Sequence, residues 1–462
     1  MDVDDLHRAF REARVGARPS GKQERRTSRV LRLPGTRLGR CTRAFVNDTI
    51  ELYPGLPAEV LSPSRGHLTM IRFPAGIVAA CCMAWAAAAF AAPEYSEELI
   101  FPLHPQHNHA PGVVECPNGD LLVSWYRGSG ERRSDDVAVF GSRLRKGEST
   151  WSEAFLMADN PEFPDCNTCM MIDEDDKLWL FWPIILDNHW ESALTNYRTS
   201  TDYQGDGAPE WDWQGVIWLK PFDFKDRALG LFEDALAKRP ELKTRITDYR
   251  EGLESRLGNK LGQRMGWQPR CKPTILSTGR YVLPLYTDTY SFSLMALSDD
   301  KGKHWYASEP LIGFGNIQPA VLERKDGTLV AYMRENGIMD KIRVAESKDG
   351  GKTWGPVGVA DLPNPGSGLD AVRLENGNWV LIYNDTTRGR NSLAVSLSED
   401  EGKTWKYTRH VEKHDKGSYH YPAIIQGKDG TIHAVYSYFV EGGKSMKHAA
   451  FNEDWIKAGD QG

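Results

Sequence analysis

The sequence has no excess of basic residues and no phosphate-binding loop. Its 57 Lys and Arg residues are outnumbered by 63 Asp and Glu residues, which gives a formal net charge of −6. The body of the chain contains no long basic stripe, so the composition argues against a nucleic-acid-binding protein. No nucleotide-binding or other cofactor motif is present, and we therefore expect no cofactor.

Cysteine is also scarce. Of the seven cysteines, three lie in the first ninety residues. The other four are Cys116, Cys166, Cys169 and Cys271. Cys166 and Cys169 have the spacing of zinc ligands, but no second cysteine pair or histidine pair stands at a matching spacing. We interpret all four as buried thiols and predict no metal site; oxidation to disulfides is the alternative.

Residues 70–92 differ in character from the rest of the chain. They begin with a basic residue, Arg72, continue as an apolar run and end on small residues that include an A-x-A pattern at Ala89–Ala91. This order is typical of a secretory signal peptide, so we expect the mature protein to be periplasmic or secreted. An uncleaved membrane anchor is the alternative, because the apolar run is long enough to span a bilayer.

The preceding residues, 1–69, are rich in arginine and follow neither a strand pattern nor a helical one. Two interpretations fit. Met70 is the true start of the protein, or the segment is a disordered basic arm. In both cases we expect no ordered structure there.

Two repeats organise the remainder of the chain. The pattern S-x-D-x-G-x-x-W occurs at Ser298–Trp305, Ser347–Trp354 and Ser398–Trp405, a period of about fifty residues. A second repeat places an Asp-Gly or Asn-Gly turn between two apolar runs, as in 320–334 and 371–385. Such turns between alternating apolar residues indicate β-hairpins.

Each period supplies about four short strands, which make one blade of a β-propeller. Six such units begin near residues 110, 166, 271, 318, 369 and 421. We therefore predict an all-β fold, a six-bladed β-propeller over residues 93–462. A strand at 97–102 is expected to complete the last blade and close the ring.

One segment, 222–263, interrupts the β pattern between blades two and three. It is rich in helix formers, and Leu229, Phe232 and Leu236 fall on one helical face. We predict a helical hairpin inserted into the propeller. It either clips the side of the propeller, forms a wall beside the substrate, or makes a dimer contact.

The S-x-D-x-G-x-x-W segments resemble the Asp-box of the sialidase (BNR-repeat) superfamily. Further stretches resemble the bacterial exported group described as sialidase-like; they are 315–319, 363–368, 383–390 and 419–422. The resemblance covers about residues 95–455. It implies a six-bladed sialidase-like propeller that acts on a glycan, without specifying the sugar. The boxes themselves are interpreted as structural, with the Asp accepting backbone N–H groups and the Gly permitting positive φ.

In a propeller, polar residues that begin an innermost strand or follow the second strand point toward one end of the central channel, here called the mouth. Sialidases hold the sugar carboxylate with three arginines, because a guanidinium binds a carboxylate through two parallel hydrogen bonds. By resemblance, Arg334 corresponds to the second arginine and Arg388 or Arg390 to the third. Solvated loop residues are the alternative for the last two.

The resemblance also implies a nucleophile and a proton donor. Sialidases use a Tyr, activated by a Glu, to attack the anomeric carbon, and an Asp as general acid and base. Tyr421, at the start of blade six, stands where the nucleophile would be. Asp136 stands in the loop of the acid and base, with Glu131 as the second candidate there. A strand aromatic and a hydrated loop are the alternative interpretations.

The chain departs from the family where the first arginine is expected, because His109 stands in that place. Arg127 and Arg270 are the candidates to replace the arginine in space. A histidine can act as acid or base near neutral pH. His109 and His420 therefore support a second hypothesis, in which a uronate-linked sugar is cleaved by hydrolysis or β-elimination.

Further polar residues at blade starts are expected to bind sugar hydroxyls; they are Asn167, Lys272, Gln318 and Asp370. The leading hypothesis is an exported glycoside hydrolase of sialidase type that removes a terminal, anionic sugar from a glycan. The uronate-active enzyme and a non-catalytic carbohydrate-binding propeller are the alternatives. A glycan is the expected partner, with no nucleic acid and no membrane span in the mature protein, and the oligomeric state stays open.

Overall fold

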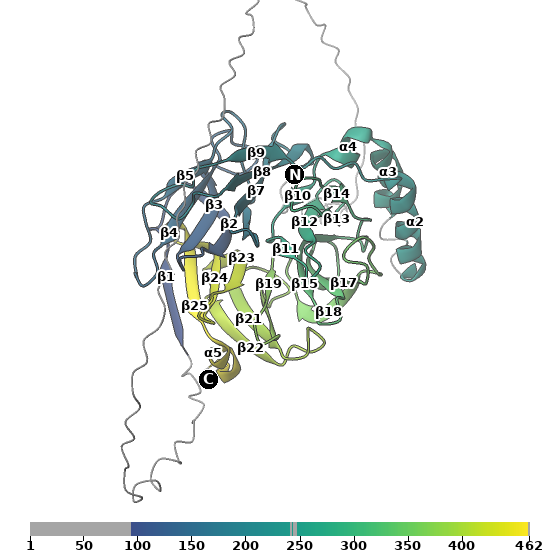
Figure 1. Ribbon diagram of the computed structural model, residues 1–462. Coiled ribbons are helices and arrows are strands. Elements are labelled where there is room, and N and C mark those ends of the chain that lie inside the picture. Colours follow the sequence, from purple (N-terminus) through teal and green to yellow (C-terminus); the bar gives the residue numbers. More distant parts are fainter. Residues whose placement is uncertain (1–93, 241–242, 244–246, 461–462) are drawn as a thin grey trace, which may run out of the picture. The chain divides into compact units, whose positions relative to one another are not determined.

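The computed structural model describes residues 94–460 except 241–242 and 244–246. The predicted signal peptide at 70–92 and the upstream segment 1–69 lie outside these residues. The described chain forms six antiparallel sheets arranged as the blades of a propeller (Figure 1). This confirms the predicted six-bladed β-propeller.

The first three blades follow one another along the sequence. Blade one contains β2 (His107–Glu115), β3 (Leu121–Gly128), β4 (Ala138–Leu144) and β5 (Phe155–Ala158). Blade two contains β6 (Cys169–Ile172), β7 (Leu178–Ile185), β8 (Ala193–Ser200) and β9 (Trp213–Val216), with the short helix η1 (Trp190–Ser192) before β8. Blade three contains β10 (Gln268–Pro269), β11 (Thr274–Ile275), β12 (Tyr281–Thr287), β13 (Phe292–Ser298) and β14 (Tyr306–Ala307). Its innermost strand is split in two, since β10 and β11 both pair with β12.

The last three blades repeat this order. Blade four contains β15 (Asn316–Glu323), β16 (Leu329–Glu335), β17 (Lys341–Ser347) and β18 (Gly358–Pro363). Blade five contains β19 (Asp370–Arg373), β20 (Trp379–Tyr383), β21 (Ser392–Ser398) and β22 (Tyr407–Lys413). Blade six contains β23 (Ser418–Gln426), β24 (Ile432–Val440), β25 (Gly443–Phe451) and β1 (Tyr95–Leu99), and α5 (Glu453–Ala458) follows it.

The ring is closed by the first described strand. β1 pairs antiparallel with β25 in the register Tyr95 to Phe451 and Leu99 to Lys447, so the outer edge of blade six comes from the other end of the chain. This is the closure predicted from the sequence, although the strand begins two residues earlier than expected. Because β1 covers the free edge of β25, the last blade has four strands, as blades one, two, four and five do.

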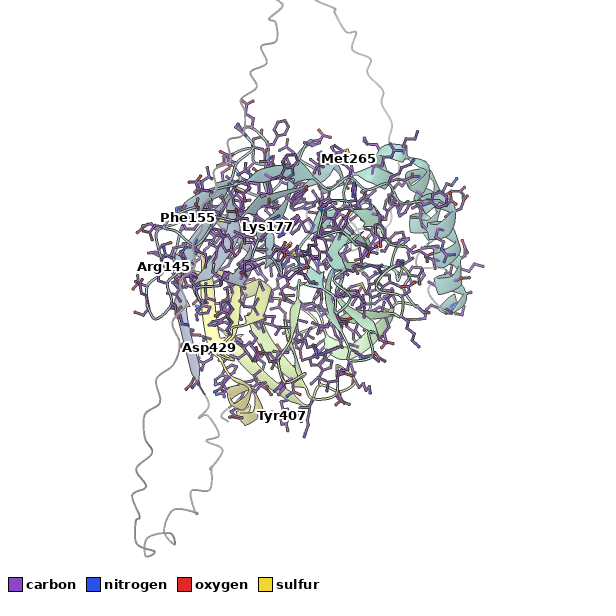
Figure 2. All side chains as sticks on the ribbon, in the orientation of Figure 1. Arg145, Phe155, Lys177, Met265, Tyr407 and Asp429 are labelled. Carbon is purple, nitrogen blue, oxygen red and sulfur yellow. The ribbon has the colours of Figure 1, made fainter. Side chains whose placement is uncertain are left out.

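The cores lie between neighbouring blades. Strands such as β7, β12, β16 and β20 are buried along their whole length. Both faces of each sheet are therefore covered, and side chains fill the spaces between the blades (Figure 2). This explains why the central part of each of these strands is apolar on both faces.

The predicted helical insertion is present between blades two and three. It consists of α2 (Phe224–Ala237), α3 (Thr247–Gly258) and α4 (Lys260–Arg264). Phe232 and Leu236 of α2 are buried in one cluster with Leu283 and Phe292 of blade three. The insertion thus packs as a clip on the side of the propeller. No helix in the described residues is long and apolar enough to cross a membrane.

The Asp-boxes have the structural role that was expected of them. In the third box, Asp400 Oδ1 accepts a hydrogen bond from the backbone N–H of Thr404 at 2.8 Å, and the Gly402 N–H donates to Ser398 Oγ at 2.8 Å. The other two boxes repeat these contacts. Gly402 has a φ of 80°, a conformation that glycine adopts without steric cost.

We expect Gly402→Ala to destabilise the propeller more than Gly430→Ala does. Both glycines have positive φ, at 80° and 89°, and an alanine there costs ~1–2 kcal/mol. A Cβ on Gly402 would also collide with the Tyr332 hydroxyl and lie 2.7 Å from the Trp379 ring, whereas a Cβ on Gly430 meets nothing within 4 Å. The collision adds ~1–3 kcal/mol. Urea denaturation measures the free energy of unfolding of both variants. Equal losses of stability would contradict the contact between Gly402 and Tyr332 of the preceding blade.

Candidate functional site

Three innermost strands share a bulge at the mouth, and each bulge precedes a proline. The register shifts in β2, β15 and β23, and the bulged residues are Ala110, Gln318 and Tyr421, with φ of 52°, 55° and 53°. Asn167 of blade two also has a positive φ, 37°. Residues other than glycine rarely adopt such angles, and bulges redirect side chains beside functional sites. The shared bulge therefore marks the mouth as the candidate site.

Tyr421 lies among three arginines from three blades. The guanidinium carbons of Arg270, Arg334 and Arg390 lie 5.1, 5.9 and 5.7 Å from the centroid of its ring. Arg334 Nη1 donates a hydrogen bond to the Tyr421 hydroxyl at 2.7 Å, and Gln318 Nε2 donates a second at 3.1 Å. The ring and the hydroxyl thus face concentrated positive charge.

Two of these guanidinium groups are buried with unused donors. Arg270 is 1% exposed and Arg334 is 2% exposed. Nε and Nη1 of Arg270, and Nε and Nη2 of Arg334, are buried without a hydrogen-bond partner among the described residues. Burial of a charge without a partner is costly. A bound anion would supply the missing acceptors, so the mouth is built to take one.

A belt of polar side chains continues from Tyr421 into blades two and three. Asn167 Nδ2 donates to Tyr286 Oη at 3.1 Å and to Gln268 Oε1 at 3.2 Å. Gln268 Nε2 in turn donates to Asp288 Oδ2 at 3.1 Å. Tyr286 is within electrostatic reach of both Asp288 and Tyr421. The belt therefore brings a carboxyl group to the same mouth as the tyrosine.

Asp288 is suited to hold a proton near neutral pH. Burial raises the pKa of Asp288 to about 6, against the opposing charge of Arg334. The side chain is half-buried, and among the described residues it accepts one hydrogen bond, from Gln268. A carboxyl group with such a pKa can donate a proton to a leaving group and take it back.

Two histidines stand on the other side of Tyr421. The His109 ring stacks on Tyr421 with centroids 4.3 Å apart and meets the His420 ring edge-on at 4.8 Å. Burial lowers the pKa of each histidine well below its ordinary value, and neighbouring cations lower it further. His109 Nδ1 lies 2.8 Å from Ser437 Oγ, while His420 Nδ1 is buried without a partner. Both imidazoles are therefore neutral at neutral pH.

A family model for the BNR repeat-like domain matches residues 119–236 and 267–434, which is more than half of the chain. The chain belongs to the BNR repeat-like family. Within the described residues, this BNR-repeat propeller has no group of three or more His, Cys, Asp or Glu side chains that could hold a metal ion. The four cysteines are buried thiols without disulfides, as interpreted from the sequence.

Two curated relatives are sialidases by name. The chain is 28% identical over 169 residues to a sialidase of Micromonospora viridifaciens, an alignment that covers 34% of this chain and 25% of that protein. It is 25% identical over 192 residues to an anhydrosialidase of Macrobdella decora, covering 37% of this chain and 25% of that protein. The chain thus spans about a quarter of the length of these relatives.

Solved structures agree with the fold. A Dyadobacter fermentans protein of unknown function matches with a TM-score of 0.59 at 17% identity, over 77% of this chain and 97% of that chain. The NanB sialidase of Streptococcus pneumoniae matches with a TM-score of 0.58 at 14% identity, over 78% of this chain and 71% of that chain. At such identities the likeness establishes the sialidase-type propeller and nothing about the reaction.

The carboxylates predicted in the blade-one loop, Asp136 and Glu131, are engaged in contacts within blade one. Asp136 is exposed and accepts hydrogen bonds from the backbone and the hydroxyl of Ser129. Glu131 accepts a hydrogen bond from Tyr126 at 3.0 Å and lies 3.3 Å from His107 Nε2. Burial opposes ionisation of Glu131, but these contacts and a nearby arginine lower its pKa to about 2. Glu131 is thus ionised at neutral pH and has no proton to donate.

The structure separates the other predicted binding residues into two groups. Arg270, Arg334, Arg390, Gln318, Asn167 and His420 meet at the mouth, as described above. Arg127 instead donates to Asn108 at 2.7 Å and lies over the Phe101 ring. Asp370 accepts hydrogen bonds from Lys272 at 2.8 Å and from the backbone of Ile424 at 3.0 Å, so it connects blade five to blades three and six. Arg388 is exposed.

The tyrosine lacks the partner that the resemblance implies. Its hydroxyl contacts a guanidinium and the Gln318 amide, and no described carboxylate makes a hydrogen bond to it. An amide cannot accept a proton as a Glu would. Gln318 was expected to bind a sugar hydroxyl, and its Oε1 is buried without a partner, which leaves an acceptor for that purpose.

Sequence reasoning missed Asp288, Gln268, Tyr286 and Ser437. Asp288 follows the second strand of blade three directly, so it satisfies the rule by which Arg334 was found. It was missed because the helical insertion before blade three makes the start of that blade hard to locate in the sequence. In addition, no family motif includes this position. Ser437 and Tyr286 lie inside strands that read as apolar, and only their contacts assign them to the mouth.

Proposed function

We propose that the protein is a glycoside hydrolase of sialidase type that removes a terminal sugar carrying a carboxylate. The observation that supports this most is the convergence of Arg270, Arg334 and Arg390 on Tyr421, with unused donors on the first two. Planar guanidinium groups are matched to carboxylates. The secretory leader interpreted in residues 70–92 remains a prediction.

In the proposed reaction the Tyr421 hydroxyl loses its proton to solvent water, and its oxygen attacks the anomeric carbon while the bond to the leaving group breaks. The tyrosine regains a proton from solvent when water releases the sugar. The surrounding arginines stabilise negative charge that develops on the tyrosine oxygen before attack. Asp288 gives its proton to the leaving oxygen and then takes one from the water that releases the sugar. A neutral tyrosine also avoids repulsion of the substrate carboxylate.

A second candidate function is cleavage at a uronate-linked sugar with histidine as the acid or base. It is favoured by one specific observation, the pair of neutral imidazoles of His109 and His420 in contact with Tyr421. The amide of Gln318 in place of an activating carboxylate also favours it. In this reaction the arginines hold the uronate carboxylate.

The test is activity of the chain on a panel of sialosides and uronate-capped glycans. We expect release of one class of terminal sugar and a loss of ~100-fold or more in kcat/KM for Arg334→Met, because a buried charge-assisted pair with the substrate is removed. Arg264→Met, on the exposed end of α4, is the matched control and keeps its activity. Absence of both cleavage and binding across the panel would overturn the proposal, and binding without cleavage would identify a lectin.

A further inference from the structure

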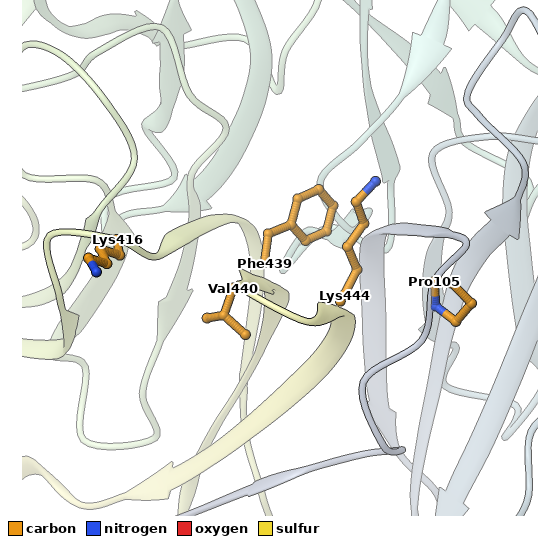
Figure 3. Close-up of a pocket in the computed structure, with 6 residues that line it drawn as sticks. Pro105, Lys416, Phe439, Val440 and Lys444 are labelled. Carbon is orange, nitrogen blue, oxygen red and sulfur yellow. The ribbon is translucent and has the colours of Figure 1, made fainter.

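A hollow lies beside the mouth, over blade six and the segment that precedes β2 of blade one. Its volume is about 360 Å³. It is lined by Pro105, Lys416, Phe439, Val440, Gly443 and Lys444. Figure 3 shows Lys416 on one side of Phe439 and Val440, and Lys444 and Pro105 on the other. No residue predicted from the sequence belongs to this hollow.

Phe439 forms the wall between the hollow and the mouth. Its ring centroid lies 4.6 Å from that of His420, 5.5 Å from that of His107 and 5.8 Å from that of His109. His109 in turn stacks on Tyr421. A glycan that extended from Tyr421 to the hollow would therefore pass over His109 and Phe439.

The hollow carries positive charge that no described carboxylate neutralises. Lys444 Nζ lies 5.0 Å from the Phe439 ring centroid and 3.3 Å from His107 Nδ1, and Lys416 is exposed. Apart from the contact of Lys444 with His107, neither lysine has an ion pair with a residue in the described part of the chain. An aromatic face beside two ammonium groups suits a sugar ring that bears a carboxylate or a sulfate, since the ring stacks and the anion pairs.

We infer that this hollow binds the second sugar of the substrate and selects one that is itself anionic. The inference rests on the proposed function, because the terminal sugar is proposed to bind to the arginines around Tyr421. The inference limits the substrates to glycans that carry negative charge on two successive sugars. The first sugar would lie at Tyr421 and the second on the other side of Phe439. A neutral second sugar would give neither lysine an anionic partner.

The test is calorimetric binding of matched disaccharides to the full chain at low and high salt. One pair is glucuronyl-glucuronate and glucuronyl-glucose; the other is sialyl-galactose 6-sulfate and sialyl-galactose. We expect the member with the charged second sugar to bind ~10-fold tighter in at least one pair, with the advantage shrinking as salt rises. Lys444→Met and Lys416→Met should each reduce that advantage. The matched control, Lys348→Met, removes the same charge from an exposed Asp-box turn.

The outcomes separate the two proposals. In one outcome both members of a pair bind equally well, and binding is lost in Arg334→Met. This result overturns the inference about the hollow and leaves the proposed function standing. A preference that persists in both lysine variants also overturns the hollow. Absence of binding to all four disaccharides overturns the proposed function, and the inference fails with it.

Discussion

Tyr421→Phe is expected to lower kcat/KM for glycan hydrolysis by ~10³-fold or more, because it removes the attacking oxygen. The substitution leaves the ring that stacks on His109 and faces the three arginines, so substrate binding should persist. Steady-state kinetics together with calorimetric binding of the released sugar separate the two effects. A loss confined to kcat assigns Tyr421 to the chemical step.

Tyr419→Phe is the matched control for this variant. Tyr419 lies two residues away on the same strand, β23, and is buried in the core between blades five and six. Removal of its hydroxyl should leave kcat unchanged. If Tyr421→Phe retains activity and His109→Ala abolishes it, the tyrosine is not the nucleophile and the histidine reaction replaces the one proposed.

Asp288→Asn is expected to remove the alkaline limb of the pH profile and to lower kcat/KM by ~10²–10⁴-fold for substrates with poor leaving groups. Burial raises the pKa of Asp288 to about 6. Its protonated fraction therefore falls as the pH rises through 6, and a reaction that needs the proton slows in the same range. Substrates with good leaving groups need little protonation and should be affected less. Hydrolysis of aryl glycosides with leaving groups of graded acidity, measured from pH 4 to pH 9, provides the data.

Asp136→Asn tests the competing assignment made from the sequence. Asp136 is exposed and accepts its hydrogen bonds from Ser129, so its substitution should leave the alkaline limb in place. If Asp136→Asn removes the limb and Asp288→Asn does not, the proton donor resides in the blade-one loop. In that case the role of Asp288 is to accept the hydrogen bond from Gln268 and hold that side chain in place.

The fold was predictable because the sequence patterns that specify it are short and recur along the chain. Each Asp-box and each Asp-Gly or Asn-Gly hairpin specifies a turn through contacts within a few residues, as in Ser398, Asp400 and Gly402. The turn recurs at a fixed spacing, and that spacing is the blade. The helical insertion was visible for the same reason, since its apolar face repeats at helical spacing.

The site was predictable only where a family motif supplied the role. Tyr421, Arg334 and Arg390 were found in this way, and the structure brings them together. Asp288, the proton donor proposed from the structure, was not found in this way, because loop carboxylates such as Asp136 and Asp288 look alike in sequence. What distinguishes them is burial and the neighbours that raise or lower the pKa, and these come from other blades.

The sequence by itself therefore determined the propeller, its six-fold repeat and the arginine-rich mouth with a central tyrosine. Only the tertiary structure decided that Arg270 lies beside the tyrosine while Arg127 contacts Asn108. It also decided that Gln318 contacts the tyrosine hydroxyl and that Lys416 and Lys444 line one hollow. The physical reason is that turns and strands depend on residues close in sequence. The electrostatics of a propeller mouth depend on side chains from separate blades, whose distances are set by closure of the ring.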